Sequence, residues 1–380
     1  MKKFFFSICA LAAVAVGCTK SEVLNRPNAD TPIVFEPYSG RVPVTKATAA
    51  DIDTLGEAGF QVYAFMHKAG VDPSYSAPYM NTVVTKDGDN WTYNGNAYWP
   101  ATNQLDFIAY GLNAGATPVE GDLTKINFTM TDVVADQKDL LVAKTQENQT
   151  HTEENDGTLA LTFSHLLSRV GFSLVTKASN AIFVTIEQVN LVGKFYAAGQ
   201  VDLTATKSTT LTLNSEQVTL DRPYITPTGD AAETTYKLLG TAGNFTSAGS
   251  ADGVAIFDNS MLYTLTDTEN KTGDDHTDDA YIAKETPSEA ETAQAAANEK
   301  NRYMMIIPAT KATHEASLKV KYFLPGAGTF EEVTVPVDID FEAGKSYNFK
   351  FKVSTNGISF SVAVEGWDVT GETSTEIQLN

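Results

Sequence analysis

Histidine is the side chain of this protein best suited to acid–base or metal chemistry, and the sequence holds five. His314 and Glu315 begin a phrase of the HExxH type, in which two histidines one helical turn apart bind zinc. Leu318 stands where the second histidine is required. His165 has no serine or cysteine nucleophile phrase beside it, which favours a structural role over general-base catalysis. The histidines therefore predict no catalytic residue and no cofactor.

Two stretches rich in carboxylates are the remaining candidates for metal binding. Asp274–Asp279 has the oxygen ligands that Ca²⁺ prefers, but it lacks the alternating ligands and the central glycine of an EF-hand. Asp87–Asn90 is typical of a hairpin turn. We interpret both as loops, and the sequence predicts no metal site.

Cys18 is suited to another kind of chemistry, the covalent attachment of lipid. It follows two lysines and an apolar run, Phe4–Val16, that is too short to span a bilayer and is typical of an export signal. The small residues Ala15–Gly17 resemble a bacterial lipobox, with Ala15 in place of the more usual leucine. We expect removal of residues 1–17 and attachment of palmitate or a similar acyl chain to Cys18, which would anchor the protein to the outer membrane. An ordinary secretory signal is the alternative.

The charge balance argues against one class of partner. The formal net charge is -20, and only 19% of the residues are charged. Lysine and arginine form no cluster of the kind that binds phosphates, so we expect no nucleic acid partner. Cys9, the only other cysteine, lies in the expected signal peptide, so the mature chain should contain no disulfide.

Apolar residues alternate with polar ones in many short segments rich in Val, Ile, Thr, Phe and Tyr. This pattern predicts strands with one buried and one wet face, as in antiparallel sheets packed into sandwiches. Ser288–Lys300 alone is typical of a helix. The expected strands are Gly59–Met66, Leu105–Gly111, Gly157–Phe163, Arg169–Thr176, Ile182–Val192, Thr209–Leu213, Arg302–Ala309, Ala316–Leu324, Glu331–Ile339, Ser346–Ser354 and Gly357–Trp367.

The length of 380 residues exceeds what a single core usually organises, so we expect two domains. Strong strand patterns continue to Val192 and looser, more polar sequence follows, which places the division near residue 193. The expected organisation is a signal peptide (1–17), a lipidated N-terminal segment removed by proteolysis (18–45), an N-terminal β-sandwich domain (46–192) and a C-terminal β-sandwich domain (193–380).

Several phrases occur in an order that resembles a known family. They are Val62–Phe65, Tyr98–Gly111, Lys138–Lys144, Leu159–Val175, Arg302–Thr310, Leu318–Leu324 and Phe341–Val353, followed by Val364–Asp368. Together with the lipobox they resemble the fimbrillin-like lipoproteins of Bacteroidales, which are subunits of cell-surface pili. The resemblance covers nearly all of the mature chain. It implies an all-β fold of two transthyretin-like antiparallel β-sandwich domains with few short helices, and a role in adhesion.

The resemblance also implies an assembly mechanism and partners. In this family a trypsin-like protease removes an N-terminal segment that includes a strand, and the groove left open accepts a strand from the next subunit. The incoming backbone supplies hydrogen bonds, while alternate side chains fill the groove. We therefore expect other pilin subunits, a trypsin-like processing protease and the outer membrane as partners.

Residues 31–48 contain the parts that this mechanism requires. A first strand is expected at Ile33–Phe35, and Arg41 and Lys46 follow as candidate protease cleavage sites, with Arg41 preferred. Glycine and proline in this segment should keep it accessible to a protease. The alternative is that Arg41 is a solvated side chain in a lipoprotein tether.

The C-terminal residues 371–380 are a candidate donor strand, because Thr373, Thr375, Ile377 and Leu379 would share one face. Ile377 and Leu379 are the only large apolar residues there, so a frayed tail and a native last strand are alternatives. Stalk, tip and anchor roles in the pilus all stay open.

A group of aromatic residues supports a second hypothesis for the function, the binding of glycans. Trp91, Tyr93, Tyr98 and Trp99 lie close in sequence, and exposed aromatic faces can stack on sugar rings. A glycan-binding surface lipoprotein, or an adhesive pilus tip or anchor component that binds glycans or proteins of host or bacterial surfaces, is therefore the second hypothesis. We expect Trp99 and Trp367 to pack in the core.

Overall fold

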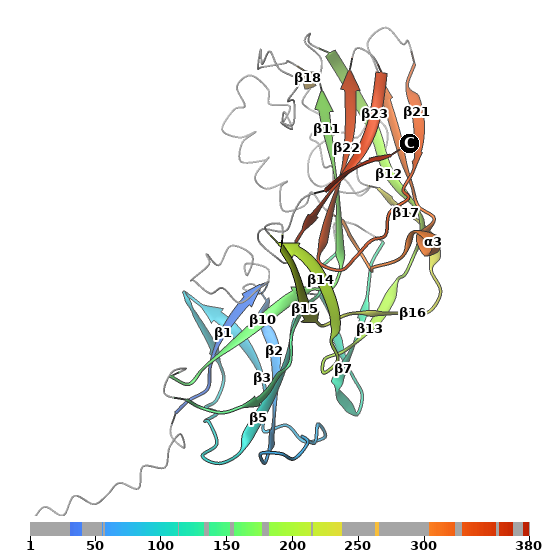
Figure 1. Ribbon diagram of the computed structural model, residues 1–380. Coiled ribbons are helices and arrows are strands. Elements are labelled where there is room, and N and C mark those ends of the chain that lie inside the picture. Colours follow the sequence, from blue (N-terminus) through green and yellow to red (C-terminus); the bar gives the residue numbers. More distant parts are fainter. Residues whose placement is uncertain are drawn as a thin grey trace, which may run out of the picture.

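A computed structural model of the chain shows two lobes made almost entirely of β-strands (Figure 1). It describes residues 31–39, 55, 58–112, 114–132, 137–152, 156–176, 182–213, 216–237, 263–265, 304–323, 329–354, 357–367 and 375–379. The helix expected at Ser288–Lys300 and the acidic loop at Asp274–Asp279 lie outside these residues. A short helix, α3 (Lys311–His314), is described.

The first lobe is built on an eight-stranded sheet with the order β1-β10-β8-β5-β2-β3-β4, in which β9 pairs with β5 (Figure 1). A four-stranded sheet, β16-β13-β7-β6, packs on one face of it. The bounds are β1 (Val34–Ser39), β2 (Phe60–His67), β3 (Met80–Asp87), β4 (Asn90–Tyr93), β5 (Gln104–Gly111), β6 (Thr117–Val119), β7 (Asp122–Thr129), β8 (Leu141–Ala143), β9 (Gln146–Gln149), β10 (Thr158–His165), β13 (Ala198–Asp202) and β16 (Thr226–Thr228).

The second lobe is a sandwich of two five-stranded sheets. One has the order β19-β11-β22-β23-β24, and the other has the order β17-β12-β20-β21 with β18 paired to β12. A separate hairpin, β14-β15, lies between the lobes in the view of Figure 1. The bounds are β11 (Ser168–Thr176), β12 (Ile182–Phe195), β14 (Lys207–Leu213), β15 (Glu216–Arg222), β17 (Ala232–Lys237), β18 (Tyr263–Leu265), β19 (Met304–Ile306), β20 (Ser317–Phe323), β21 (Glu331–Pro336), β22 (Lys345–Ser354), β23 (Gly357–Gly366) and β24 (Thr375–Leu379).

The cores follow from the alternation of the strands. In the second lobe, apolar side chains from both sheets meet in one buried cluster, to which β22 contributes Phe349 and β12 contributes Leu191. In the first lobe, successive residues of β2 enter two different clusters, with Val62 on one face and Tyr63 on the other. Both faces of the eight-stranded sheet are therefore buried, which explains why β2 is apolar along nearly its whole length.

Polar and stacking contacts join the two lobes. The Gly344 N–H, just before β22 of the second lobe, donates at 2.9 Å to the carbonyl of Leu167, whose side chain is buried in the first lobe. The ring of His165, at the end of β10, stacks on Trp367 after β23, with 3.9 Å between centroids and 15° between planes. These contacts fix the chain at the point where it passes from one lobe to the other.

The all-β prediction is confirmed, and most strand pairs are antiparallel as expected. Among the described strands, two pairs are parallel: β1 with β10, and β11 with β22. Parallel neighbours require long connections, and more than a hundred residues separate each of these strands from its partner. Both β12 and β13 lie near residue 193, yet β12 joins the second lobe and β13 the first. The domain division near residue 193 and the transthyretin-like arrangement stay predictions.

Candidate functional site

The feature of the first lobe that bears most directly on function is β1. Its residues pair in parallel with β10, from Val34 opposite Thr158 to Ser39 opposite Phe163. Just before β1, Pro32 forms an antiparallel bridge with Tyr98, which follows β4. The segment 31–39 therefore lies between two edges of the same sheet, one supplied by β10 and the other by residues 97–99.

Backbone hydrogen bonds hold the start of this segment on both sides. The Ile33 N–H donates to the Ala97 carbonyl at 2.9 Å, and the Trp99 N–H donates to the Thr31 carbonyl at 3.0 Å. The next residue turns to the other edge, where the Val34 N–H donates to the Gly157 carbonyl at 3.0 Å. A strand in this position can form backbone hydrogen bonds with both edges, whether it belongs to this chain or to another subunit.

The side chains of the segment alternate between core and solvent. Ile33 and Phe35 are 1% and 3% exposed, and Pro37 is also buried, whereas Val34 is 41% exposed. Ile33 and Phe35 belong to the buried cluster on one face of the eight-stranded sheet. The first strand expected at Ile33–Phe35 is thus confirmed, with the paired portion extending to Ser39.

Phe35 occupies a pocket lined by aromatic rings. Its ring makes edge contacts with Phe60, Tyr93 and Phe107, at centroid distances of 6.1, 5.7 and 6.1 Å. Edge-to-face contacts of this kind stabilise aromatic pairs by about 0.5–1.5 kcal/mol beyond the burial of their area. Phe35 is therefore the principal anchor of β1.

Gly157 permits the close approach of the segment before β1. It has φ +79°, and a Cβ atom at this position would lie 2.7 Å from the Pro32 carbonyl oxygen. The Trp99 indole N–H donates to the Gly157 carbonyl at 3.0 Å, which fixes the turn before β10. A residue without a side chain is therefore required where the segment crosses this turn.

The C-terminal tail forms β24, an edge strand on β23. Ile377 pairs with Val362 and Leu379 with Phe360, so both apolar side chains lie on the core face of the sheet. Ile377 is nevertheless 36% exposed. On the other face the Glu376 carboxylate accepts a hydrogen bond from Ser361 at 2.9 Å and lies 3.6 Å from the Lys350 ammonium.

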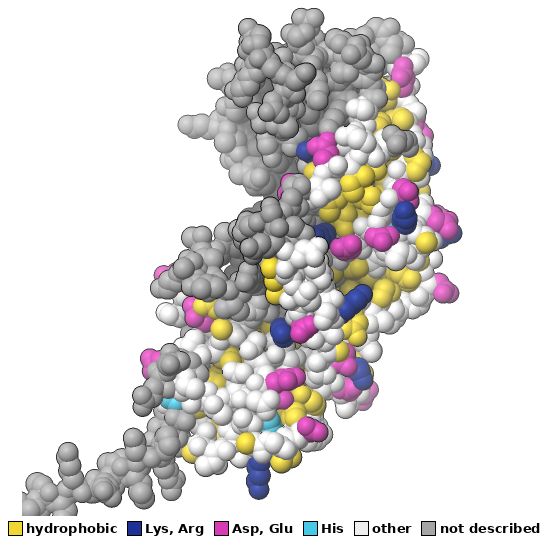
Figure 2. Space-filling model, in the orientation of Figure 1, with side chains coloured by type: hydrophobic (Ala, Val, Ile, Leu, Met, Phe, Trp, Pro, Cys, Tyr) yellow, Lys and Arg dark blue, Asp and Glu magenta, His cyan; other side chains and the backbone are white. Residues whose placement is uncertain are grey.

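A groove of about 600 Å³ opens between β24 and the ends of β20 and β21. Ile377 and Leu379 line one side, and Ala316 and Val337 line the other. Figure 2 shows hydrophobic side chains on this face of the second lobe, with acidic and basic side chains interspersed rather than gathered. The tail is docked on its own lobe, with its apolar side chains incompletely covered.

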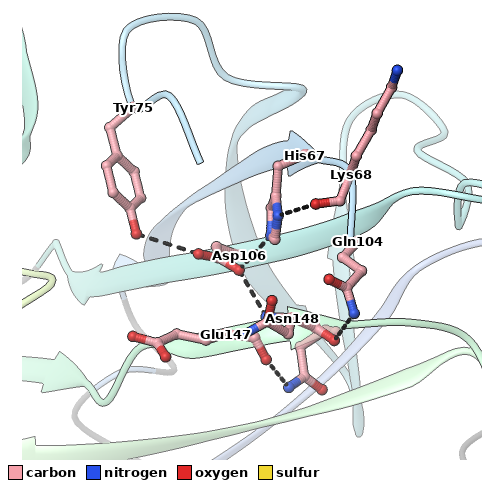
Figure 3. Close-up of polar contacts among 8 residues, drawn as sticks. His67, Lys68, Tyr75, Gln104, Asp106, Glu147 and Asn148 are labelled. Atoms are coloured by element: carbon pink, nitrogen blue, oxygen red, sulfur yellow. Dashed lines mark hydrogen bonds and ion pairs between the residues drawn. The ribbon is translucent and has the colours of Figure 1, made fainter. Parts of the chain in front are cut away.

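A buried polar cluster ties the loop after β2 to the sheet (Figure 3). His67 Nε2 lies 2.9 Å from Asp106 Oδ1, the Tyr75 hydroxyl donates to Asp106 Oδ2 at 3.3 Å, and the Asn148 N–H donates to Oδ1 at 2.7 Å. Burial raises the pKa of Tyr75 to about 12, and the charge of Asp106 adds to this effect. Because three protein groups already contact the buried carboxylate, the cluster is suited to holding the loop in place.

Two further histidines, His165 and His314, also have structural surroundings. His165 donates from Nδ1 to the carboxylate of Asp139. His314 is fully buried, and its ring lies 4.8 Å from that of Phe341. Within the described residues, no three histidine, cysteine or acidic side chains gather as metal ligands. The turn expected at Asp87–Asn90 is confirmed as the hairpin between β3 and β4.

The four aromatic residues of the second hypothesis lie in different environments. Trp99 is buried as expected, Tyr93 packs on the core and contacts Phe35, and Trp91 is 5.5 Å from Phe60. Tyr98 alone is exposed, and its carbonyl accepts a hydrogen bond from the exposed Tyr79. These residues therefore do not form one continuous exposed platform.

The other predicted sites fall in part outside the described residues. Cys18, Arg41 and Lys46 lie there, as does Thr373 of the candidate donor strand, while Thr375, Ile377 and Leu379 are in β24. Within the part of the chain that the structure describes, no helix has the length and hydropathy needed to cross a bilayer.

The pairing of residues 31–33 with 97–99 was not predicted, because it joins segments more than 60 residues apart.

The geometry is that of an all-β protein whose first strand is an edge strand held in an aromatic groove. The profile of the fimbrillin-like family matches residues 45–271 and 244–367, and the chain belongs to this family. A search of curated proteins finds no match.

The chain is also similar to several solved structures. A fimbrial protein from Bacteroides vulgatus is 16% identical, with a TM-score of 0.54 over 88% of this chain and 99% of that chain. A proposed cell adhesion protein from Bacteroides uniformis is 16% identical, with a TM-score of 0.44 over 89% of this chain and 99% of that chain. A fimbrial assembly protein from Parabacteroides distasonis is 10% identical, with a TM-score of 0.40 over 90% and 97%. The first of these shows a shared fold.

Proposed function

We propose that this protein is a structural subunit of a cell-surface pilus, exported as a lipoprotein through Cys18 and assembled by strand exchange at the groove now filled by β1. The family supports a role in pili and adhesion at the cell surface. The observation that carries the strand-exchange proposal is the position of β1: a terminal strand with two buried anchors, Ile33 and Phe35, between two sheet edges.

The order of the segments supports proteolysis as the trigger. Arg41 and Lys46 follow β1 directly in sequence, so a cut at either would separate β1 from the rest of the first lobe. The cut strand would then be held only by noncovalent contacts and would be replaceable by another strand. A trypsin-like protease is the proposed processing enzyme.

The tail is the proposed donor to a neighbouring subunit. Residues 375–379 are an edge strand with exposed side chains, and Ile377 and Leu379 present the alternation that a groove requires. The exposed pair Tyr79 and Tyr98 is the observation that keeps contact with surface glycans as a second candidate function.

The test uses the chain from Cys18 onward, treated with a trypsin-like protease. N-terminal sequencing locates the cut, and fluorescence anisotropy measures uptake of a labelled peptide of residues 31–39. We expect a cut after Arg41 or Lys46 and peptide uptake by the cut chain alone. Equal uptake by cut and uncut chains, or a chain that resists cleavage in this segment, would contradict the proposal.

A further inference from the structure

The pocket of Phe35 is the part of the β1 groove that is most selective for side-chain shape. The ring of Phe35 contacts the rings of Phe60, Tyr93 and Phe107. The centroid distances are 5.7 to 6.1 Å and the interplanar angles are 64° to 89°. A smaller, nonplanar side chain would leave these edge contacts unmade and a void behind it. The pocket is thus complementary to an aromatic residue.

The tail of this same chain has no such residue. Residues 371–380 contain no phenylalanine, tyrosine or tryptophan. When Ile377 takes the position of Ile33, Leu379 takes the position of Phe35, because both pairs are two residues apart. A shift by two residues would place Ile377 or another aliphatic or small residue in the pocket instead. No register of the tail fills the space that Phe35 fills.

We propose that the groove of this subunit selects a donor strand from a different chain, one that carries an aromatic residue two positions after an aliphatic one, over the tail of a second copy. This inference rests on the proposed function, since it names the partner of the same groove. The subunit would then join two different kinds of subunit. Its groove binds a donor strand with an aromatic residue, and its own tail binds a groove of different shape on another subunit.

Competition between peptides tests this preference. The chain from Cys18 onward is cut with a trypsin-like protease and loaded with a labelled peptide of residues 31–39. The unlabelled competitors are residues 31–39, the native tail 371–380, the tail with Leu379→Phe and the tail with Gln378→Phe. The last is a matched control, because it adds the same ring on the opposite face of the strand.

We expect the Leu379→Phe tail to compete at least about tenfold better than the native tail, and the Gln378→Phe tail to gain little. A native tail that competes as well as the Leu379→Phe tail would overturn the preference for a different chain and leave strand exchange intact. A gain from Gln378→Phe equal to that from Leu379→Phe would overturn it as well. Failure of residues 31–39 themselves to exchange would overturn both proposals.

Discussion

The Tyr93 hydroxyl donates a hydrogen bond to the Ile33 carbonyl at 2.8 Å, while the ring of Tyr93 packs on Phe35. One side chain therefore holds both the backbone and the main anchor of the first strand. Burial raises the pKa of Tyr93 above its ordinary value of 10.0, so the phenol stays protonated and remains a donor at neutral pH.

Replacing Tyr93 by phenylalanine separates these two contributions. The Tyr93→Phe variant keeps the ring contact and loses the hydrogen bond to Ile33 together with the longer contacts to the Ala97 backbone, so we expect a loss of about 1 kcal/mol in the free energy of unfolding. In the cut protein the same change should accelerate release of the β1 peptide, measured by fluorescence anisotropy. Stability and release rate both equal to those of the wild type would show that the hydrogen bond does not hold β1.

Gly157 allows a test in which backbone strain is matched. Gly157→Ala places a methyl group 2.7 Å from the Pro32 carbonyl, whereas Gly121 has the same φ of +79° and no atom within 4 Å of its added Cβ. Both variants carry the strain of a non-glycine residue at positive φ, about 1 kcal/mol or more. We expect only Gly157→Ala to increase the release of β1 from the cut protein. Equal release from both variants would show that contact with Pro32 is unimportant.

His314 should make the second lobe sensitive to acid. Its Nε2 donates to the Ile339 carbonyl at 2.8 Å and its Nδ1 accepts from the Ala316 N–H at 2.9 Å, an arrangement that requires the neutral ring. Burial lowers the pKa of His314 below 6.5. The unfolded chain then binds the proton more readily, so this stability is present above pH 6.5 and is lost as the pH falls through the lowered pKa.

Urea titrations at pH 8 and pH 5.5 measure this dependence. We expect the unfolding midpoint of the wild type to fall at pH 5.5, and that of His314→Gln to fall less, because glutamine carries a donor and an acceptor but does not titrate. An equal fall in both proteins would assign the acid sensitivity to other groups.

His67 should have the opposite effect. Burial, the largest single effect, would lower its pKa, but the hydrogen bonds to Asp106 and to backbone carbonyls, together with the charge of Asp106, outweigh burial and raise the pKa above 6.5. The stability from this ion pair is therefore fully present below pH 6.5 and is lost as the pH rises through the raised pKa. We expect the first lobe of His67→Gln to lose less stability than the wild type between pH 6 and pH 9, measured by hydrogen exchange at Gln61 and Val62. A wild-type profile that is flat over this interval would contradict the assignment.

Strands with regular alternation were predictable from the sequence, and those with irregular patterns were not. Ser346–Ser354 and Gly357–Trp367 match β22 and β23 almost residue for residue. Asp122–Thr129 was not predicted as β7, because Thr124 and Lys125 separate Leu123 from Ile126 and only the last residues alternate. Local patterns also carry no information on which distant strands pair, so neither the parallel pairing of β1 with β10 nor the buried His67–Asp106 pair could be predicted.

The sequence predicted which residues of the first strand would be part of the candidate site, but it did not predict the pocket that holds them. A first strand at Ile33–Phe35 was expected because the mechanism implied by the family resemblance requires one in this segment. The pocket around Phe35 depends on Phe60, Tyr93 and Phe107, which come from separate strands and converge only after the sheet has formed. This dependence on tertiary packing is why a sequence reading could propose strand exchange and could not propose which donor would fit.

A disulfide between residues 32 and 98 tests the central claim, exchange of β1, most directly. The hydrogen bonds from Ile33 to Ala97 and from Trp99 to Thr31 flank the Pro32–Tyr98 pair, which makes it a non-hydrogen-bonded antiparallel pair of the kind that a disulfide can bridge. Both side chains are exposed, and no cysteine follows Cys18 in the native sequence.

The measurement is uptake of the labelled 31–39 peptide by the cut Pro32→Cys/Tyr98→Cys variant, with each single-cysteine variant as a control. We predict that the oxidised double variant is cut by the protease yet takes up no peptide, and that a reducing agent restores uptake to the level of the single variants. Equal uptake by the oxidised and reduced forms would contradict the account, because the peptide would then bind somewhere other than the groove of β1.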